Sequence, residues 1–265
     1  MRFFAQIGDL FLGLLRYLGE LALLMGQVFE SIAKGRKRWT QFFRQIVEIG
    51  FRSQPVVIIT GGFTGAVLAA QALFQFRLVG METLAGGLVS AAMLRELGPT
   101  ITGLMLAGRV GSSMAAEIGT MRVTEQIDAL RSMAVHPIDY LVTPRVMAMV
   151  VSIPLLLAQS VVCGIFASYL VGVPLFNVEE AIWWENVRKY SSVDDVKVAL
   201  IKGGVFGFLI VVIACHQGLK ASNGAVGVGR GTTNAMVFSS LAILVANFLL
   251  SMLMQIVFPI GFVQV

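Results

Sequence analysis

The sequence predicts an all-α membrane protein, in which an N-terminal amphipathic helix precedes about five transmembrane helices. Of its 265 residues, 57% are hydrophobic and 13% are charged, whereas an ordinary soluble domain carries about 25% charged residues. Five apolar stretches approach or reach the ~20 residues that cross ~30 Å of hydrocarbon. Basic residues precede the first of these stretches. We therefore expect one membrane domain, residues 1–265, rather than a soluble fold.

Residues 1–30 show the spacing of an amphipathic helix. The apolar positions are Phe3, Phe4, Ile7, Leu10, Phe11, Leu14, Leu18, Leu21, Met25, Val28 and Phe29, and the polar positions are Arg2, Gln6, Asp9, Arg16, Glu20, Gln27 and Glu30. The pattern is typical of a helix lying in the membrane interface, although a helix packed on a soluble partner has the same pattern. A cleavable signal peptide is not indicated, because the segment lacks an unbroken apolar core and a small-residue cleavage site.

Residues 1–53 form an interfacial and basic segment with eight Lys or Arg residues: Arg2, Arg16, Lys34, Arg36, Lys37, Arg38, Arg44 and Arg52. Beside a membrane span, such residues favour the cytoplasmic side, next to anionic lipid. Nucleic-acid binding is not indicated, because the basic residues are not interleaved with aromatic residues in a soluble module.

The expected spans are residues 54–76, 84–108, 146–173, 198–216 and 235–258. Five crossings from a cytoplasmic N-terminus place the C-terminus outside. The predicted external loop, 174–197, holds five acidic and three basic residues, whereas the predicted internal loop, 109–145, holds four arginines. Trp183 and Trp184 fall where an interfacial aromatic belt is expected.

Small residues recur four positions apart in three of these spans. They are Gly61, Gly65 and Ala69; Gly103, Ala107 and Gly111; and Gly203 and Gly207. Such faces allow membrane helices to approach closely. We therefore expect a tight bundle or a dimer.

The second span carries two charges near its midpoint, in the sequence Leu94–Pro99. A charge at that depth costs about 2.5–3.5 kcal/mol on insertion scales. Pro99 has no N–H for the carbonyl of Arg95, so the helix is expected to kink or break there. One interpretation is a polar pathway lined by Arg95 and Glu96. The alternatives are a self-neutralising pair at a helix interface, or a misplaced span boundary.

The internal loop predicts a short amphipathic helix after Thr124, which can act as its N-cap, with Glu125 in the first turn. Three apolar residues then share one face: Ile127, Leu130 and Ala134. The helix is either a connector or an element that docks into a groove on a soluble partner.

The sequence provides no catalytic, nucleotide or metal site. Residues 224–233 are rich in glycine but have neither the Lys nor the preceding strand of a phosphate-binding loop, so we expect a flexible cytosolic turn. His136 and His216 have no neighbouring ligands in the sequence, and Cys163 and Cys215 lie in apolar stretches.

Several motifs resemble the signatures of Mla-type permeases, the membrane subunits of ABC transporters that work with MCE-domain lipid-binding proteins. They are LeuArgGluLeuGlyPro (94–99), AlaGlyArg (107–109), AlaGluIleGlyThrMetArgValThrGluGln (116–126) and ThrProArg (143–145). The resemblance covers essentially the whole chain, and the 116–126 string is highly specific.

The resemblance implies a permease in the inner membrane of a Gram-negative bacterium, with its N-terminus cytoplasmic and its C-terminus periplasmic. It would move phospholipid between that membrane and a periplasmic MCE-protein shuttle, which maintains outer-membrane lipid asymmetry. The implied partners are a second copy of the chain, a cytosolic ABC ATPase, a hexameric MCE-domain protein, and a small STAS-domain protein bound through the ATPase. The chain would be a non-catalytic subunit without a cofactor, because ATP and Mg²⁺ would bind the ATPase.

The resemblance also implies roles for individual residues. The segment 117–131 would be a coupling helix that contacts the ATPase through Glu117, Arg122, Glu125, Asp128 and Arg131. The lipid path would be lined by Arg95, Glu96, Gln71, Phe74 and Gln75.

Three other classes are weighed against this transporter. A proton-coupled secondary transporter would use Glu96 as its proton site. A structural anchor for a periplasmic assembly would tolerate neutral residues at positions 95 and 96. A lipid-modifying enzyme would need a reactive constellation that the sequence does not provide.

Overall fold

The computed structural model describes residues 2–34 and 39–257, and this part of the chain is helical throughout its regular elements, with no strand. Three residues of the predicted basic segment, Arg36, Lys37 and Arg38, and the predicted end of the last span, residue 258, lie outside the described residues. The α-helices are α1 (Arg2–Ala33), α2 (Trp39–Ile49), α3 (Gln54–Leu78), α4 (Ala85–Ala92), α5 (Gly98–Leu106), α6 (Ser112–Val123), α7 (Gln126–Ser132), α8 (Thr143–Gly172), α9 (Glu180–Tyr190), α10 (Val193–Leu219) and α11 (Gly224–Val257). Three π-helical turns, η3 (Met93–Leu97), η4 (Ala107–Gly111) and η5 (Ile138–Val142), and two 3₁₀ turns, η1 (Phe51–Ser53) and η2 (Glu82–Leu84), connect them.

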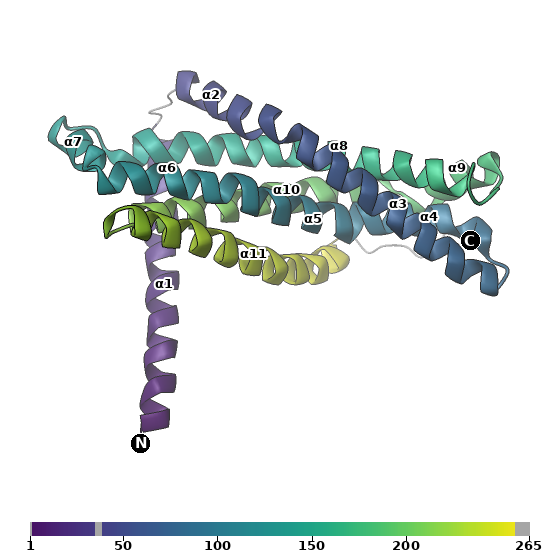
Figure 1. Cartoon of the computed structure of the whole chain (residues 1–265), viewed down its shortest axis with the longest axis horizontal. Coiled ribbons are helices and arrows are strands. Elements are labelled where there is room, and N and C mark those ends of the chain that lie inside the picture. The colour runs from purple at the N-terminus through teal and green to yellow at the C-terminus, as the bar shows by residue number, and fades with distance from the viewer. Residues whose placement is uncertain (1, 35–38, 258–265) are drawn as a thin grey trace.

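The long helices lie along one direction and form a bundle, with α7 at one end and α9 at the other (Figure 1). Because α7 precedes α8 and α9 follows it, α8 traverses the bundle in one direction and α10 returns. The predicted internal and external loops therefore lie at opposite ends. Helix α1 runs across the direction of the other helices (Figure 1), as a helix in the membrane interface would. Its place in the interface remains a prediction.

Four helices of the described chain are long and apolar enough to cross a membrane: Trp39–Leu78, Ile138–Gly172, Val193–Leu219 and Gly224–Ile256. They match four of the five predicted spans, although the predictions 146–173 and 235–258 run one and two residues past the ends of these helices. The fifth predicted span, 84–108, is also helical, but it is divided by η3 and η4 and is not among these four. Its charged residues at 95 and 96 lower its apolar character, so this crossing remains a prediction.

Close helix packing at small residues is confirmed within the chain. A Cβ added to Gly65 would overlap the backbone of Gly164 on α8, and one added to Gly61 would overlap Ser160. On α10, a Cβ at Gly207 would lie 2.9 Å from the carbonyl oxygen of Met149. These glycines let α3 and α10 pack against α8 at backbone distance.

Two predictions about local structure are wrong. Residues 224–233 are the first turns of α11, not a flexible turn. Gly119 on α6 allows α11 to approach, because a Cβ at Gly119 would lie 3.5 Å from the side chain of Val228. Glycine lowers helix propensity by only about 1 kcal/mol, and packing of this kind offsets that cost.

Trp183 does not belong to an exposed aromatic belt. It is fully buried, and its ring fills the space left by Gly86 on α4 and Gly172 on α8. Helix α9 folds back over α4 and thereby covers the indole. Trp184, the next residue, is 38% exposed and stacks on Tyr169 with ring centroids 5.4 Å apart.

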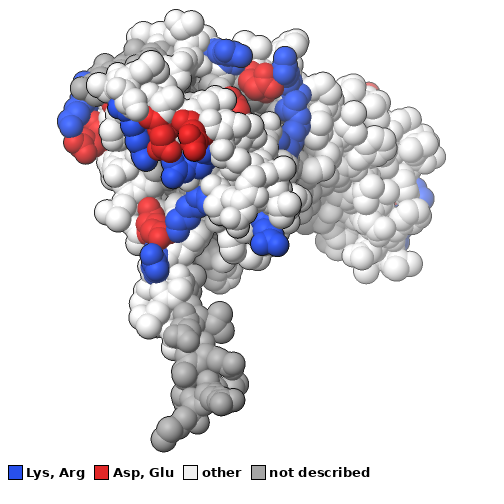
Figure 2. All heavy atoms as spheres, turned by 60° about the vertical axis from the view of Figure 1, so that its left-hand side comes forward, with Lys and Arg blue, Asp and Glu red and all other residues white. Residues whose placement is uncertain are grey.

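Charged side chains gather at the α7 end of the molecule, whereas the visible surface farther along the bundle is mostly uncharged (Figure 2). The buried apolar residues form two clusters: one holds Leu106 and Ile210, and the other holds Leu94 and Trp183. Residues 85–123, from α4 to α6, make one pass through the bundle. Along this pass, Arg95 and Glu96 lie between Leu94 of one apolar cluster and Leu106 of the other.

Candidate functional site: a charged cluster at mid-bundle

The π-helical turn η3 positions two charged side chains in the middle of the bundle. Within this turn the N–H of Gly98 donates to the carbonyl of Met93, five residues earlier. Pro99 follows at the start of α5 and cannot donate to the carbonyl of Arg95. The Nζ of Lys202 on α10 donates to that carbonyl instead, at 2.6 Å. The predicted interruption at Pro99 is therefore a π-helical turn with an external donor, rather than a break in the helix.

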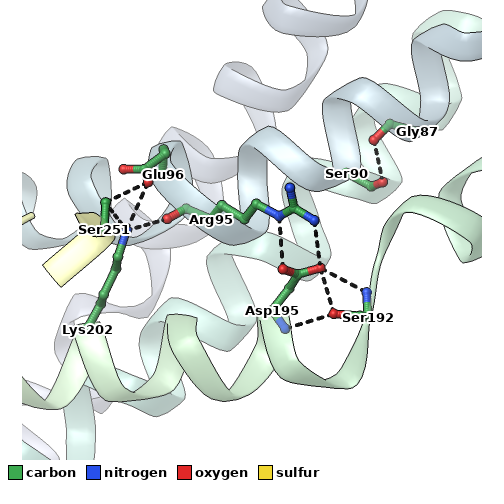
Figure 3. Close-up of polar contacts among 8 residues, drawn as sticks. All are labelled: Gly87, Ser90, Arg95, Glu96, Ser192, Asp195, Lys202 and Ser251. Atoms are coloured by element: carbon green, nitrogen blue, oxygen red, sulfur yellow. Dashed lines mark hydrogen bonds and ion pairs between the residues drawn. The ribbon is translucent and has the colours of Figure 1, made fainter. Parts of the chain in front are cut away.

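Arg95 binds the first turn of α10. Its Nε lies 2.9 Å from Oδ1 of Asp195, and its Nη2 lies 3.4 Å from Oδ2 (Figure 3). Asp195 is already part of a capping box with Ser192, whose backbone N–H and hydroxyl both donate to Oδ2 at 2.9 Å. The arginine thus pairs with a carboxylate that is itself fixed by its helix cap.

Glu96 points toward α10 and α11. Its Oε1 accepts from the Nζ of Lys202 at 3.1 Å and from the hydroxyl of Ser251 at 2.7 Å, and its Oε2 accepts from Nδ2 of Asn247 at 2.7 Å. Lys202 is 1% exposed and also donates to Ser251 at 2.8 Å (Figure 3). Because the opposite charges pair, the cluster is close to neutral and can remain in an apolar bundle.

The two charges do not neutralise each other, so the self-neutralising alternative is wrong. Each finds a partner within the same chain about one hundred residues away, Arg95 on α10 and Glu96 on α10 and α11. Neither partner is predicted from the sequence. Lys202 was the available signal, because a lone lysine inside a predicted span marks a functional or paired site. Asp195 is one of the five acidic residues of the predicted external loop.

The three other predicted path residues lie apart from this cluster. Gln71, Phe74 and Gln75 are exposed on α3, where Phe74 meets the ring of Phe176 at 5.2 Å between centroids. In the described part of the chain, no hydrogen bond or ion pair joins them to Arg95 or Glu96. The five residues predicted to line the lipid path are therefore not joined by direct polar contacts between these two groups.

At the α7 end, the structure brings together most of the residues predicted to contact an ATPase. Asp128 accepts from Nη1 of Arg122 at 2.9 and 3.0 Å and from Nη1 of Arg131 at 3.1 Å. Separately, Glu117 lies 2.8 Å from Nη2 of the buried Arg145 on α8. These pairs tie the α6–α7 turn together and attach α6 to α8.

The helix boundaries in this segment differ from the prediction. Thr124 ends α6 and donates to the carbonyl of Thr120, and Glu125 takes the N-cap position of α7 in a left-handed conformation with φ of 59°. The range 117–131 is thus two helices joined by a tight turn. Ile127 is buried, as expected for the apolar face, but Ala134 lies beyond α7 with φ of 56°.

The comparisons with known proteins agree with the motifs. A family model described as Permease MlaE matches residues 42–253. A "Probable ABC transporter permease protein" of Rickettsia conorii is 43% identical over 233 residues, which cover 88% of this chain and 90% of that protein. The intermembrane phospholipid transport system permease protein MlaE of Haemophilus influenzae is 31% identical over 255 residues, covering 96% of this chain and 98% of that protein.

The chain is also similar to a chloroplastic protein, TRIGALACTOSYLDIACYLGLYCEROL 1 of Arabidopsis thaliana. It is 38% identical over 232 residues, which cover 88% of this chain and 66% of that protein. The matched range of the family model includes the mid-bundle cluster and the α6–α7 turn. The chain therefore belongs to the MlaE permease family.

Proposed function

We propose that this chain is the permease subunit of an ABC transporter that moves phospholipid between the inner membrane and a periplasmic MCE-protein shuttle. The observation that carries the proposal is the similarity of nearly the whole chain to permeases of ABC transporters, one of them named for intermembrane phospholipid transport. Outer-membrane lipid asymmetry would be maintained by this transport.

The geometry supports a transport subunit whose energy comes from ATP hydrolysis by a partner protein. The α6–α7 turn presents an ion-paired surface at one end of the bundle, and Arg145 connects its base to α8. A cytosolic ABC ATPase that binds ATP and Mg²⁺ would push on this turn through Glu117, Arg122, Glu125, Asp128 and Arg131. A homodimer of the permease, a periplasmic hexameric MCE-domain protein and a STAS-domain protein on the ATPase complete the proposed assembly.

Arg95 and Glu96 are proposed to line the lipid path together with Gln71, Phe74 and Gln75. The cluster supports this role because it places polar groups at mid-bundle, where irregular helix and charge are tolerated only against protein or a wet cavity. A lipid head group crossing the bundle would meet Arg95, whose side chain is 26% exposed, and Glu96, whose side chain is 47% exposed.

The proposed sidedness has a cytoplasmic N-terminus and a periplasmic C-terminus. It is supported by the four arginines of the loop 109–145, which lies at the α7 end where charged side chains gather (Figure 2).

The test is reconstitution of the complex purified from native membrane into proteoliposomes with a fluorescent phospholipid. We expect an ATPase and an MCE protein to co-purify, and lipid transfer to require ATP hydrolysis. Transfer that continues without the ATPase and follows a proton gradient would replace this proposal with a secondary transporter using Glu96. A complex that assembles normally but transfers no lipid, with or without Arg95 and Glu96, would indicate a structural anchor.

A further inference from the structure

Helix α8 begins with the Thr143–Pro144–Arg145 motif, which has no assigned role in transport. Pro144 occupies the first turn of α8, where a missing N–H leaves no helical hydrogen bond unmade. Arg145 follows it and is buried, with 3% of its surface exposed. A buried arginine requires an explanation, because burying a charge costs free energy unless the charge is paired and hydrogen-bonded.

The guanidinium of Arg145 joins two other elements. Its Nη1 donates to the carbonyl of Leu141 in η5 at 2.8 Å, and its Nη2 lies 2.8 Å from Oε2 of Glu117 on α6. Because a guanidinium is planar and rigid, these two contacts fix α6 relative to the start of α8. Its Nε is buried and has no hydrogen-bond partner among the described residues. A buried ion pair that leaves a donor unsatisfied is weak evidence for a role in stability alone.

The ion pair connects two helices that have different main neighbours. Helix α6 packs mainly on α10 and α11, whereas α8 packs mainly on α3 and α10. Among the described residues, Arg145 and Glu117 form the ion pair that attaches α6 directly to α8. A movement of the α6–α7 turn therefore reaches the start of α8 through this pair.

Helix α8 in turn sets the position of α3. It is one helix of 30 residues that continues through Pro154, and its Gly164 lies against Gly65 of α3 at backbone distance. Of the described elements, α8 is the one on which α3 mainly packs. A displacement of α8 therefore moves α3, which carries three of the five residues proposed to line the lipid path.

We propose that Arg145 is a positioning residue that transmits movement of the α6–α7 turn through α8 to α3, and so to the lipid path. The inference rests on the proposed function, because an ATPase has to move the turn. In this role Arg145 contacts neither lipid nor nucleotide. Its loss should therefore separate ATP hydrolysis, which the partner performs, from lipid transfer, which requires the permease helices to move.

The test uses the complete complex in proteoliposomes and measures ATP hydrolysis and the transfer of a fluorescent phospholipid in the same samples. Arg145→Met should leave hydrolysis within about twofold of the wild type and lower the lipid transferred per ATP hydrolysed roughly tenfold. Arg145→Lys should restore most of this ratio, because an ammonium can still pair with Glu117. If Arg145→Met keeps the wild-type ratio, whether or not both activities fall together, the proposal is overturned.

Two matched controls separate this link from general damage to the helix. Thr143→Val removes a buried hydrogen bond of 2.9 Å to Ser31 of α1, at the same helix start. Arg52→Met removes an exposed ion pair of 2.8 Å with Glu48, four residues earlier in the chain. Both variants should keep the wild-type ratio. A loss in Thr143→Val as large as that in Arg145→Met overturns the proposal.

A milder variant decides the question if Arg145→Met does not assemble. Glu117→Gln keeps an acceptor for Arg145 on a side chain that is 58% exposed, but it replaces a charge-assisted hydrogen bond with a neutral one of roughly half the strength. We expect the lipid transferred per ATP to fall about threefold, and an unchanged ratio overturns the proposal.

The wild-type complex distinguishes failure of this inference from failure of the proposed function. If the wild type shows no ATP-dependent lipid transfer, the proposed function and this inference are both overturned. If the wild type transfers lipid and the Arg145 and Glu117 variants keep its ratio, this inference alone is overturned.

Discussion

Lys202 lies inside a membrane-spanning helix with 1% of its surface exposed, and it donates to three acceptors on two other passes. One acceptor is the carbonyl of Arg95, which Pro99 leaves without its usual helical partner. The second is the carboxylate of Glu96, and the third is the hydroxyl of Ser251. A single buried ammonium therefore satisfies the irregular backbone and the buried charge of the same helix turn.

Replacing this lysine should destabilise the fold. Lys202→Met leaves the Arg95 carbonyl and the Glu96 carboxylate without a main donor, which is expected to cost about 1–3 kcal/mol of unfolding free energy. The measurement is equilibrium unfolding of the purified chain in detergent. The Lys202→Met/Glu96→Gln double variant should recover part of the loss, because it removes the uncompensated charge.

Lys197→Met provides the matched control on the same helix. Lys197 is exposed and pairs with Asp194 at 2.8 Å, so its loss should change the unfolding free energy by less than about 0.5 kcal/mol. If Lys202→Met were as mild as Lys197→Met, the buried cluster would contribute little to stability.

Among the elements, α3 and α8 make the closest helix contact that glycine permits. Gly65→Ala places a Cβ against the backbone of Gly164 and should destabilise the chain by about 1–3 kcal/mol through overpacking. Gly62→Ala, one helix turn earlier, meets nothing nearer than 3.9 Å and should stabilise the helix by up to about 1 kcal/mol. Thermal unfolding of both variants in one detergent tests the pair, and equal midpoints would refute the close packing of α3 on α8.

Helix α1 is attached to the end of α10 by charge. Glu20 accepts from Lys220 and from Nε2 of His216, the latter at 3.2 Å. The hydrogen bond from Lys220 lowers the pKa of Glu20 below its ordinary value of 4.5, with a further contribution from His216. Because the pKa is lower when α1 is docked, ionised Glu20 stabilises docking above about pH 4.5. That contribution is lost as the pH falls through the lowered pKa.

Acidification should therefore loosen α1. We expect the distance between spin labels at Gly13 and Gly229 to broaden below about pH 4.5, and Glu20→Gln to show the broadened distribution already at neutral pH. Glu30→Gln is the control, since Glu30 pairs with Lys34, the residue directly after α1, rather than with α10, and should leave the profile unchanged. A profile insensitive to Glu20→Gln would mean that Leu21, Leu24 and Val28, which are buried, hold α1 without help from charge.

At the scale of the whole molecule, the charged pass from α4 to α6 decides the topology. If it crosses the membrane and the N-terminus is cytoplasmic, the α7 end faces the cytoplasm and the α9 end faces the periplasm. In a background with Cys163 and Cys215 replaced by alanine, Glu185→Cys on α9 should react with a membrane-impermeant maleimide in intact spheroplasts. Glu125→Cys before α7 should react only after permeabilisation. The reverse result, Glu125→Cys reacting in intact spheroplasts and Glu185→Cys only after permeabilisation, would show that residues 85–123 do not cross, because only α8 separates the two sites.

The sequence by itself determined the membrane class, the approximate positions of the long helices, the close approach at Gly61 and Gly65, and the anomaly at Leu94–Pro99. Each of these follows from composition or from local periodicity, because an apolar stretch or a small-residue face is a property of consecutive residues. The motifs that indicated the permease family are local in the same sense.

Only the tertiary structure decided which residues meet. The partners of Arg95 and Glu96 lie about one hundred residues away or more, and periodicity defines the faces of a helix without naming the helix that each face contacts. Packing also overrode local preference, because Trp183 is buried by α9 folding over α4 and the glycine run at 224–233 is helical against α6. In a bundle of apolar helices, the neighbours of a side chain are set by helix packing, and this determines whether a charge is paired, a carbonyl is satisfied or an aromatic ring is exposed.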